Sequence, residues 1–211
     1  RFAAGLVAPD RCAACDCDAG GRPFCVPCWI TVVEATPLDR GKGSAPFEYG
    51  GAIAEAIRHF KFHDRPDLGR VLGDSLGRFA ASQHVRADVV VPVPLFRSRL
   101  RERGYNQSTL LSARVARHLA ARHAPRLLVR TRDTPHQVGR SRAPRVENVA
   151  GAFRVSDERE AMGRRVVLVD DVRTTGATLE ACAAALMGAG ASVSWLTLAV
   201  VPDRAGDSSS R

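Results

Sequence analysis

The sequence lacks any long run of apolar residues. Its longest fully apolar stretches, Val89 to Phe96 and Leu198 to Pro202, have the length of a β-strand, whereas a membrane-spanning helix needs about 20 residues. Residues 1–9 also lack the long apolar centre and the small-residue cleavage site of a signal peptide. No insertion into a membrane is therefore expected, and the cytoplasm is the default location.

Lysine is almost missing, since Lys42 and Lys61 are the only two among 31 basic residues. A GC-rich coding sequence accounts for this preference for arginine, but not for where the arginines lie. Between Arg97 and Arg154, fourteen arginines stand against three acids, a net charge of +11 in a chain whose total is +9. Such clustering predicts an anionic partner, either the phosphates of a small molecule or a nucleic-acid backbone.

The length and composition favour one globular domain with a small appendage. The chain has 211 residues, of which 45% are hydrophobic and 25% charged, a typical globular balance. Five cysteines and many turn-forming residues fall within the first 40 positions, so this unit needs a staple to fold. We expect a four-cysteine unit over residues 1–40, a larger domain over 41–205, and a disordered tail over 206–211.

The larger domain has the pattern of an α/β protein. Apolar residues recur at helical spacing over 53–60, 68–79, 111–119 and 177–187, and strand-length apolar runs occur at 88–93, 166–171 and 192–201. The order strand, helix, strand predicts a parallel sheet covered by helices on both faces. The polar, basic segment 130–154 is expected to form a long loop or arm.

The most informative motif runs from Val166 to Thr178. Four apolar residues predict a buried strand, and Asp170 and Asp171 follow at its carboxyl end, where open α/β sheets bind their ligands. A turn rich in threonine and glycine then leads directly into a helix, whose free N–H groups suit a phosphate. The carboxylates can accept hydrogen bonds from sugar hydroxyls and attract Mg²⁺. Ordinary helix caps would explain one or two of these residues, but not the series.

Cys12, Cys15, Cys25 and Cys28 form two Cys-x-x-Cys pairs. Four thiolates at this spacing suit a structural zinc ion. In the cytoplasm this interpretation ranks above a redox or iron–sulfur role and above disulfides. Cys17 is surplus and could replace Cys15 as a ligand.

A third motif links a proline-rich strand end, Val91 to Pro94, to the sequence Arg103-Gly104-Tyr105-Asn106-Gln107. A strand that opens into a basic, glycine-containing turn before a helix is a credible cradle for pyrophosphate. Taken alone, the motif favours a solvated basic surface over a pyrophosphate cradle.

Taken together, these motifs resemble the ComF family, phosphoribosyltransferase-like proteins associated with natural competence and DNA uptake. The resemblance covers residues 5–202, and the segment 166–178 resembles the motif with which type I phosphoribosyltransferases bind phosphoribosyl pyrophosphate (PRPP). It implies a type I phosphoribosyltransferase-like parallel sheet flanked by helices, with a small N-terminal zinc ribbon. Cys17 and Arg173 depart from the usual pattern.

The resemblance also implies roles for individual residues. Asp170 and Asp171 would hold the ribose hydroxyls, and Arg142 or Arg145 on the arm would neutralise the departing pyrophosphate. PRPP would bring Mg²⁺ with it. The pyrophosphate would lie by Arg103, Gly104, Tyr105, Asn106 and Gln107, and the 5-phosphate would lie by Arg173, Thr174, Thr175, Gly176, Ala177 and Thr178.

Two functions remain open at this point. In the first, the protein is a glycosyltransferase in which a nucleophile attacks C1 of PRPP and releases pyrophosphate. In the second, it is a module that senses PRPP or a nucleotide, while the zinc unit and the basic segment hold a competence helicase or single-stranded DNA. Only Tyr105 and Phe153 interleave with the arginines, which is few for a base-stacking surface.

Overall fold

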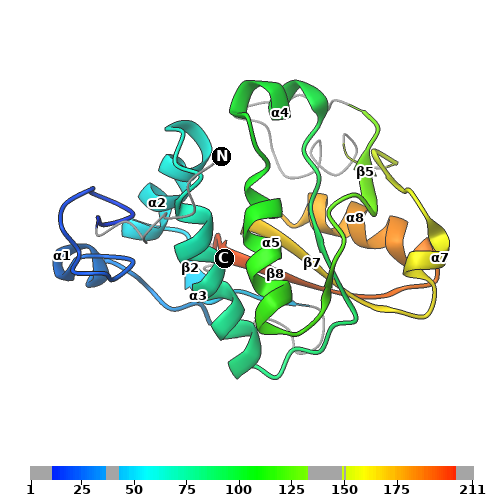
Figure 1. Cartoon of the computed structure of the whole chain (residues 1–211), viewed down its shortest axis with the longest axis horizontal. Coiled ribbons are helices and arrows are strands. Elements are labelled where there is room, and N and C mark those ends of the chain that lie inside the picture. Colours follow the sequence, from blue (N-terminus) through cyan, green and yellow to red (C-terminus); the bar gives the residue numbers. More distant parts are fainter. Residues whose placement is uncertain (1–10, 37–42, 133–148, 150, 203–211) are drawn as a thin grey trace, which may run out of the picture.

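A parallel six-stranded sheet forms the centre of the computed structural model, which describes residues 11–36, 43–132, 149 and 151–202 (Figure 1). The strand order is β1-β8-β7-β3-β4. Strand β2 also pairs with β8, closer to the carboxyl end of β8 than β1 does. The long strands are central and the short ones lie at the edges. The strands are β1 (Gly43–Ser44), β2 (Phe47–Glu48), β3 (Val89–Pro92), β4 (Arg122–His123), β7 (Arg165–Arg173) and β8 (Ser192–Val200).

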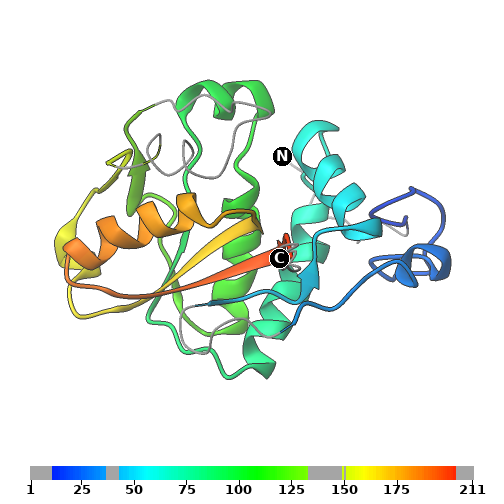
Figure 2. The ribbon, with the colours of Figure 1, turned by 180° about the vertical axis from the view of Figure 1, so that it is seen from behind.

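Helices cover both faces of this sheet. On one face lie α3 (Leu68–Ser82) and α5 (Gln107–His118), with α2 (Gly51–Phe62) beside α3. The other face is covered by α8 (Ala177–Gly188) and by a hairpin of β5 (Leu128–Arg130) and β6 (Phe153–Val155), as Figure 2 shows. Because the central strands are buried on both sides, residues 89–91 and 166–169 are apolar without interruption. The predicted parallel α/β fold is confirmed.

Three local predictions need correction. The strand expected to end at Asp171 continues to Arg173, so both carboxylates lie within β7. The basic turn after Pro94 contains a helix, α4 (Arg97–Arg103), since arginine, leucine and glutamate are good helix formers. The arm is not aperiodic throughout, because the described parts of 130–154 include β6 and the end of β5.

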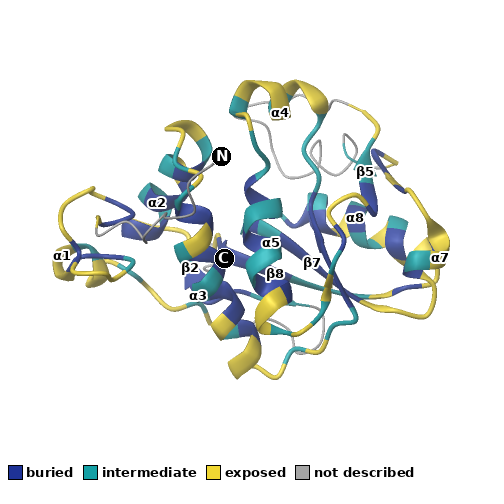
Figure 3. Cartoon of the chain, in the orientation of Figure 1, coloured by how far each residue is buried: buried dark blue, intermediate teal, exposed yellow. Residues whose placement is uncertain are grey.

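The cysteine unit packs against α2. Its described part contains a short helix, α1 (Val26–Trp29), and a bridge between Arg11 and Asp18. Ala13 and Phe24 are buried in the same core as α2 and α3. Figure 3 shows the contrast between the buried strands and the largely exposed α1 and α4. The predicted boundary at residue 40 and the tail 206–211 lie outside the described residues.

The remaining described helix is α7 (Glu158–Ala161), which precedes β7. Within the described ranges, no helix combines the length and the apolar character that crossing a bilayer requires.

Candidate functional site

The two carboxylates of β7 have different partners. Ser108, in the first turn of α5, donates its hydroxyl to Asp170 Oδ1 at 2.8 Å, and the backbone N–H of Asp171 donates to the same oxygen at 2.9 Å. Removal from water, followed by the neighbouring Asp171 carboxylate, raises the pKa of Asp170 to about 7. At neutral pH the pair therefore carries less than two full negative charges.

Lys61, near the end of α2, forms an ion pair with Asp171. Its Nζ lies 2.7 Å from Asp171 Oδ1, and the two side chains are only 23% and 8% exposed. Burial disfavours the ammonium form, but the Asp171 charge outweighs this and the pKa of Lys61 is raised. The sequence motifs did not predict Lys61 or Ser108 as residues of the site. The one signal for Lys61 was its rarity, as one of two lysines in a chain rich in arginine.

Three of the five residues in the 103–107 motif have structural roles. Gly104 ends α4 with a φ of 75°, a conformation that favours glycine. The Tyr105 hydroxyl donates to the backbone carbonyl of Phe60 at 2.5 Å and so ties this segment to α2. Asn106 caps α5 by accepting the backbone N–H of Ser108 at 3.1 Å.

Arg103 and Gln107, the other two members, carry buried nitrogen atoms without partners. Neither Arg103 Nε nor Gln107 Nε2 has a hydrogen-bond partner among the described residues, although Gln107 is only 1% exposed. Burial lowers the pKa of Arg103, whose guanidinium lies 5.0 Å from the centre of the Phe62 ring. Buried donors are normally paired, so these two atoms are suited to a ligand with oxygen acceptors.

The turn after β7 keeps backbone donors available. Gly176 has a φ of 86° and precedes α8, which no side chain caps; the Thr175 hydroxyl accepts the Ala177 N–H only at 3.4 Å. A Cβ at Gly176 would lie 3.1–3.3 Å from Arg173 side-chain atoms and 3.2 Å from Glu180. The positive φ therefore favours glycine at this position, whereas the neighbouring Arg173 and Glu180 atoms lie at the ends of flexible side chains that can shift.

Arg173, one of the two residues that depart from the family pattern, lies beside this turn. Its guanidinium lies 5.4 Å from the centre of the Trp195 ring and close to Gly176. It therefore adds positive charge beside the turn instead of enlarging it. Thr174 is exposed, whereas Thr175 and Thr178 are half-buried.

The structure thus brings together most of the predicted site. The carboxylates, the turn 174–178 and the segment 103–107 meet at the carboxyl ends of the central strands, with Lys61 added from α2. Arg142 and Arg145, expected to neutralise pyrophosphate, lie outside the described residues.

The four predicted cysteines also come together. The sulfur atoms of Cys12, Cys15, Cys25 and Cys28 all lie within 4.8 Å of one another, close enough to hold a metal ion. Tetrahedral zinc with Zn–S bonds of about 2.3 Å places its sulfurs about 3.8 Å apart, so this donor set fits zinc. A hydrogen bond from the backbone of Cys17 lowers the pKa of Cys15 to about 6, which favours the thiolate that zinc binds.

Cys17 does not belong to this four-sulfur group. Its sulfur lies 3.4 Å from that of Cys15, but it donates to the backbone carbonyl of Asp18, also at 3.4 Å. Contacts with α2 hold the unit in place: His59 Nδ1 lies 3.2 Å from the Ala13 carbonyl oxygen, and the Thr31 hydroxyl accepts the Ala52 N–H at 2.9 Å. Arg65, which follows α2, pairs with Asp16 at 2.9 Å.

Some described arginines of the arginine-rich segment are paired with acids from outside it. Arg114 pairs with Asp74 at 2.7 Å, and Arg122 pairs with Glu160 at 3.0 Å, so acids from outside the segment neutralise part of its charge. The helix α4, with its four arginines, lies at one end of α5 (Figure 1), whereas Arg114 is in the second half of α5 and Arg122 is in β4. The α4 group includes Arg103, which lies beside the candidate site.

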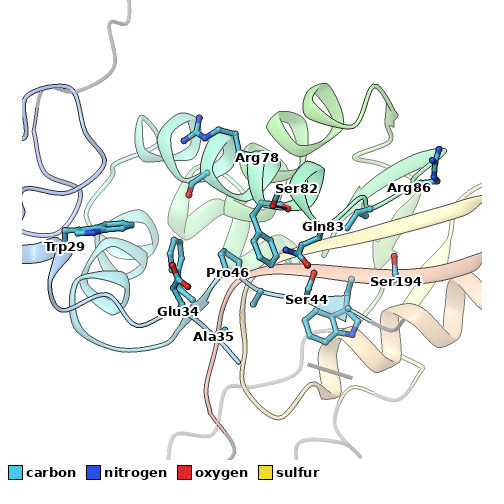
Figure 4. Close-up of a pocket in the computed structure, with 17 residues that line it drawn as sticks. Trp29, Glu34, Ala35, Ser44, Pro46, Arg78, Ser82, Gln83, Arg86 and Ser194 are labelled. Atoms are coloured by element: carbon cyan, nitrogen blue, oxygen red, sulfur yellow. Dashed lines mark hydrogen bonds between the residues drawn. The ribbon is translucent and has the colours of Figure 1, made fainter. Parts of the chain in front are cut away.

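A separate cavity of about 1200 Å³ lies between the cysteine unit, α3 and the edge strand β1. Trp29, Glu34 and Arg78 lie around it, as Figure 4 shows. None of the predicted site residues that the structure describes lines this cavity.

The chain is thus a parallel α/β protein with a polar site at the strand ends and a four-cysteine unit. No family model matches it. It is 34% identical over 173 residues to the DNA utilization protein YhgH of Escherichia coli, covering 79% of this chain and 74% of that protein. It is 31% identical over 192 residues to the competence protein ComFC of Bacillus subtilis, covering 86% and 76%.

A match to the competence protein F of Haemophilus influenzae has 37% identity over 129 residues, covering 58% of this chain and 56% of that protein. The chain therefore belongs to the ComF family.

Among solved structures, it is similar to a glutamine PRPP amidotransferase from B. subtilis, at 23% identity and a TM-score of 0.46, covering 67% of this chain and 30% of that one. For an orotate phosphoribosyltransferase from Mycobacterium tuberculosis the values are 13% and 0.37, covering 81% and 89%.

Proposed function

We propose that the protein binds PRPP, or a closely related phosphorylated ribose, at the carboxyl end of β7. The observation that carries this proposal is the pair of buried donors, Arg103 Nε and Gln107 Nε2, which lack partners among the described residues. They lie in the segment that follows β3, next to the strand that carries Asp170 and Asp171. Donors for a phosphate and acceptors for sugar hydroxyls therefore stand side by side.

In this arrangement each group has a separate task. The uncapped N-terminus of α8 and the Thr175 hydroxyl would bind the 5-phosphate, while Asp170 accepts a hydrogen bond from a ribose hydroxyl. Arg103 and Gln107 would bind pyrophosphate oxygens, since charge-assisted hydrogen bonds to phosphate are strong. By binding this nucleotide-related ligand, the protein would support the uptake or use of DNA, in keeping with the names of the relatives.

We further propose that the protein is a phosphoribosyltransferase. The bond between C1 and the pyrophosphate oxygen breaks, the acceptor's nucleophile bonds to C1, and pyrophosphate leaves with the bonding electron pair. Positioning and charge neutralisation by Arg103, and by Arg145 from the arm, supply the catalysis. The cysteine cluster plays a structural part by holding zinc, which stabilises the unit on α2.

Calorimetry with PRPP, ribose 5-phosphate and ribose tests the binding site. PRPP should bind tightest, and ribose should bind at least about tenfold more weakly than ribose 5-phosphate, because it lacks the charge-assisted bonds. Thr175→Val should weaken PRPP binding about tenfold, whereas Thr36→Val, an exposed threonine of the cysteine unit, should leave it unchanged. Equal binding of ribose and PRPP would refute the site. Binding without pyrophosphate release, across a panel of bases and amines, would make the protein a sensing module.

The exposed arginines of α4 favour a second candidate, a module that binds single-stranded DNA or presents it to a competence helicase. Arg97 and Arg101 are exposed on α4. Each phosphate contact on a single strand adds about −0.7 to the slope of log affinity against log salt. Replacing both residues by Gln should therefore make the slope shallower by about 1.4 units, and Arg117→Gln, at the far end of α5, should not change it. Anisotropy with a labelled oligonucleotide measures this, and no binding at low salt would remove DNA as a direct partner.

A further inference from the structure

The acidic pair of β7 already has a cation beside it. Lys61 Nζ lies 2.7 Å from Asp171 Oδ1, a normal distance for a charge-assisted hydrogen bond. Asp170 Oδ1 accepts two hydrogen bonds, from the Ser108 hydroxyl and the Asp171 N–H. Two of the four carboxylate oxygens are thus engaged within the protein. The sequence predicted that these carboxylates attract Mg²⁺, but the Lys61 ammonium already holds Asp171 Oδ1, so a metal ion would have to displace it from that oxygen.

We propose that the Lys61 ammonium occupies the cation position of the Asp170–Asp171 pair, so that the pair binds no divalent metal and Lys61 itself faces the ligand. The part of this proposal that concerns the ligand rests on the proposed function. The part that concerns metal binding does not. Lys61 is then a residue of the binding site and not only a stabilising contact.

The chain holds Lys61 from both sides. The backbone carbonyl of Phe60, the preceding residue, accepts the Tyr105 hydroxyl at 2.5 Å. The ring of Phe62, the following residue, lies 5.0 Å from the Arg103 guanidinium. The 103–105 segment that lines the site therefore also fixes the piece of α2 that carries the ammonium group.

The charges at the site support the same conclusion. Beyond its own element, Lys61 faces Asp171 and Asp170, which favour its charged form, and Arg103, which opposes it. Because Asp170 has a raised pKa, one ammonium nearly balances the pair. An ammonium group has three donors, so Lys61 can bind Asp171 and still donate to an oxygen of a phosphorylated sugar.

The first test measures metal binding without any sugar ligand. Zinc-loaded protein is titrated with Mn²⁺, and free Mn²⁺ is followed by electron paramagnetic resonance. The wild type should show no site that depends on Asp171. Lys61→Met should gain one Mn²⁺ site, at least about tenfold tighter than any binding by the wild type, because the competing charge is gone. Unfolding cannot mimic this gain.

Further variants test whether the new Mn²⁺ site depends on Asp171 and on the loss of charge at position 61. Asp171→Asn added to Lys61→Met should abolish the new site, and Lys61→Arg, which keeps the charge, should not create it. Arg165→Met breaks a different ion pair of β7, that between Arg165 and Asp88 at 2.6 Å, and should bind Mn²⁺ like the wild type. A wild-type Mn²⁺ site that Asp171→Asn removes would overturn the proposal, as would Lys61→Met without a gain.

The second test measures PRPP affinity with Mg²⁺ and in Mg²⁺-free buffer, without a chelator that would strip zinc. The wild type should change no more than about threefold, and Lys61→Met should lose at least about tenfold when Mg²⁺ is left out. An equal dependence on Mg²⁺ in both proteins would refute the role of Lys61 toward the ligand. If the wild type binds no PRPP while the Mn²⁺ titrations behave as expected, the proposed function fails and the cation position of Lys61 stands.

Discussion

Replacing Asp171 by Asn should lower the free energy of unfolding by about 3 kcal/mol, because it leaves the Lys61 ammonium without its partner in a site where the two side chains are 23% and 8% exposed. Breaking one half of a buried pair costs more than removing both halves. The double variant Lys61→Met, Asp171→Asn should therefore recover to within about 1 kcal/mol of the wild type. Urea unfolding at neutral pH measures all three proteins.

A control lies at the other end of the same strand. Asp88→Asn removes the partner of Arg165, but those side chains are 30% and 53% exposed, so it should cost much less stability than Asp171→Asn. The double variant should stay weak in PRPP binding even when its stability recovers, since the groups that face the ligand are gone. Additive losses from Lys61→Met and Asp171→Asn would contradict a direct coupling between the two residues.

This expectation differs from what the motif alone predicts. A strand that stopped at Asp171 would leave the carboxylates outside the core, and their replacement would weaken binding without affecting the fold. Because β7 continues to Arg173 and Asp171 is buried, a loss of binding in Asp171→Asn must be separated from a loss of stability. The double variant provides that separation.

The parts of the site that are local in sequence could be predicted. The buried strand 166–169, the two carboxylates and the Gly176 turn follow one another within thirteen residues, so hydrophobicity and turn chemistry place them without knowledge of the packing. The two Cys-x-x-Cys pairs are equally local, and their four sulfurs do come together.

The parts that depend on packing could not be predicted. Lys61 and Asp171 are 110 positions apart, and only the packing of α2 beside α3 and against Tyr105 brings them to 2.7 Å. Ser108 is an ordinary helix-start residue until α5 lies against β7. The arginine count placed the basicity in one segment and predicted an anionic partner, but it could not show that acids outside the segment pair with Arg114 and Arg122.

Loss of zinc should unfold the cysteine unit. Structural zinc supplies about 10–16 kcal/mol of apparent binding free energy in small zinc modules, and the regular structure in the described part of this unit is one four-residue helix and two isolated bridges. Cys12→Ser removes a sulfur that is completely buried and should reduce the zinc content from one equivalent to less than about 0.1. Elemental analysis measures the content directly.

Trp29 reports on the fold of the unit, because it ends α1 one residue after Cys28 and its ring centre lies 6.4 Å from that of Phe24. In a Trp195→Phe background it is the only tryptophan. Cys12→Ser, or chelation of zinc, should shift its emission to the red. Cys17→Ser removes a sulfur that does not belong to the four-sulfur group, so it should keep both the emission and the zinc. If Cys17→Ser loses the metal and Cys15→Ser retains it, the ligand set includes Cys17 in place of Cys15. Less than about half an equivalent of zinc in the wild type, with no iron to compensate, would refute a four-thiolate zinc site altogether.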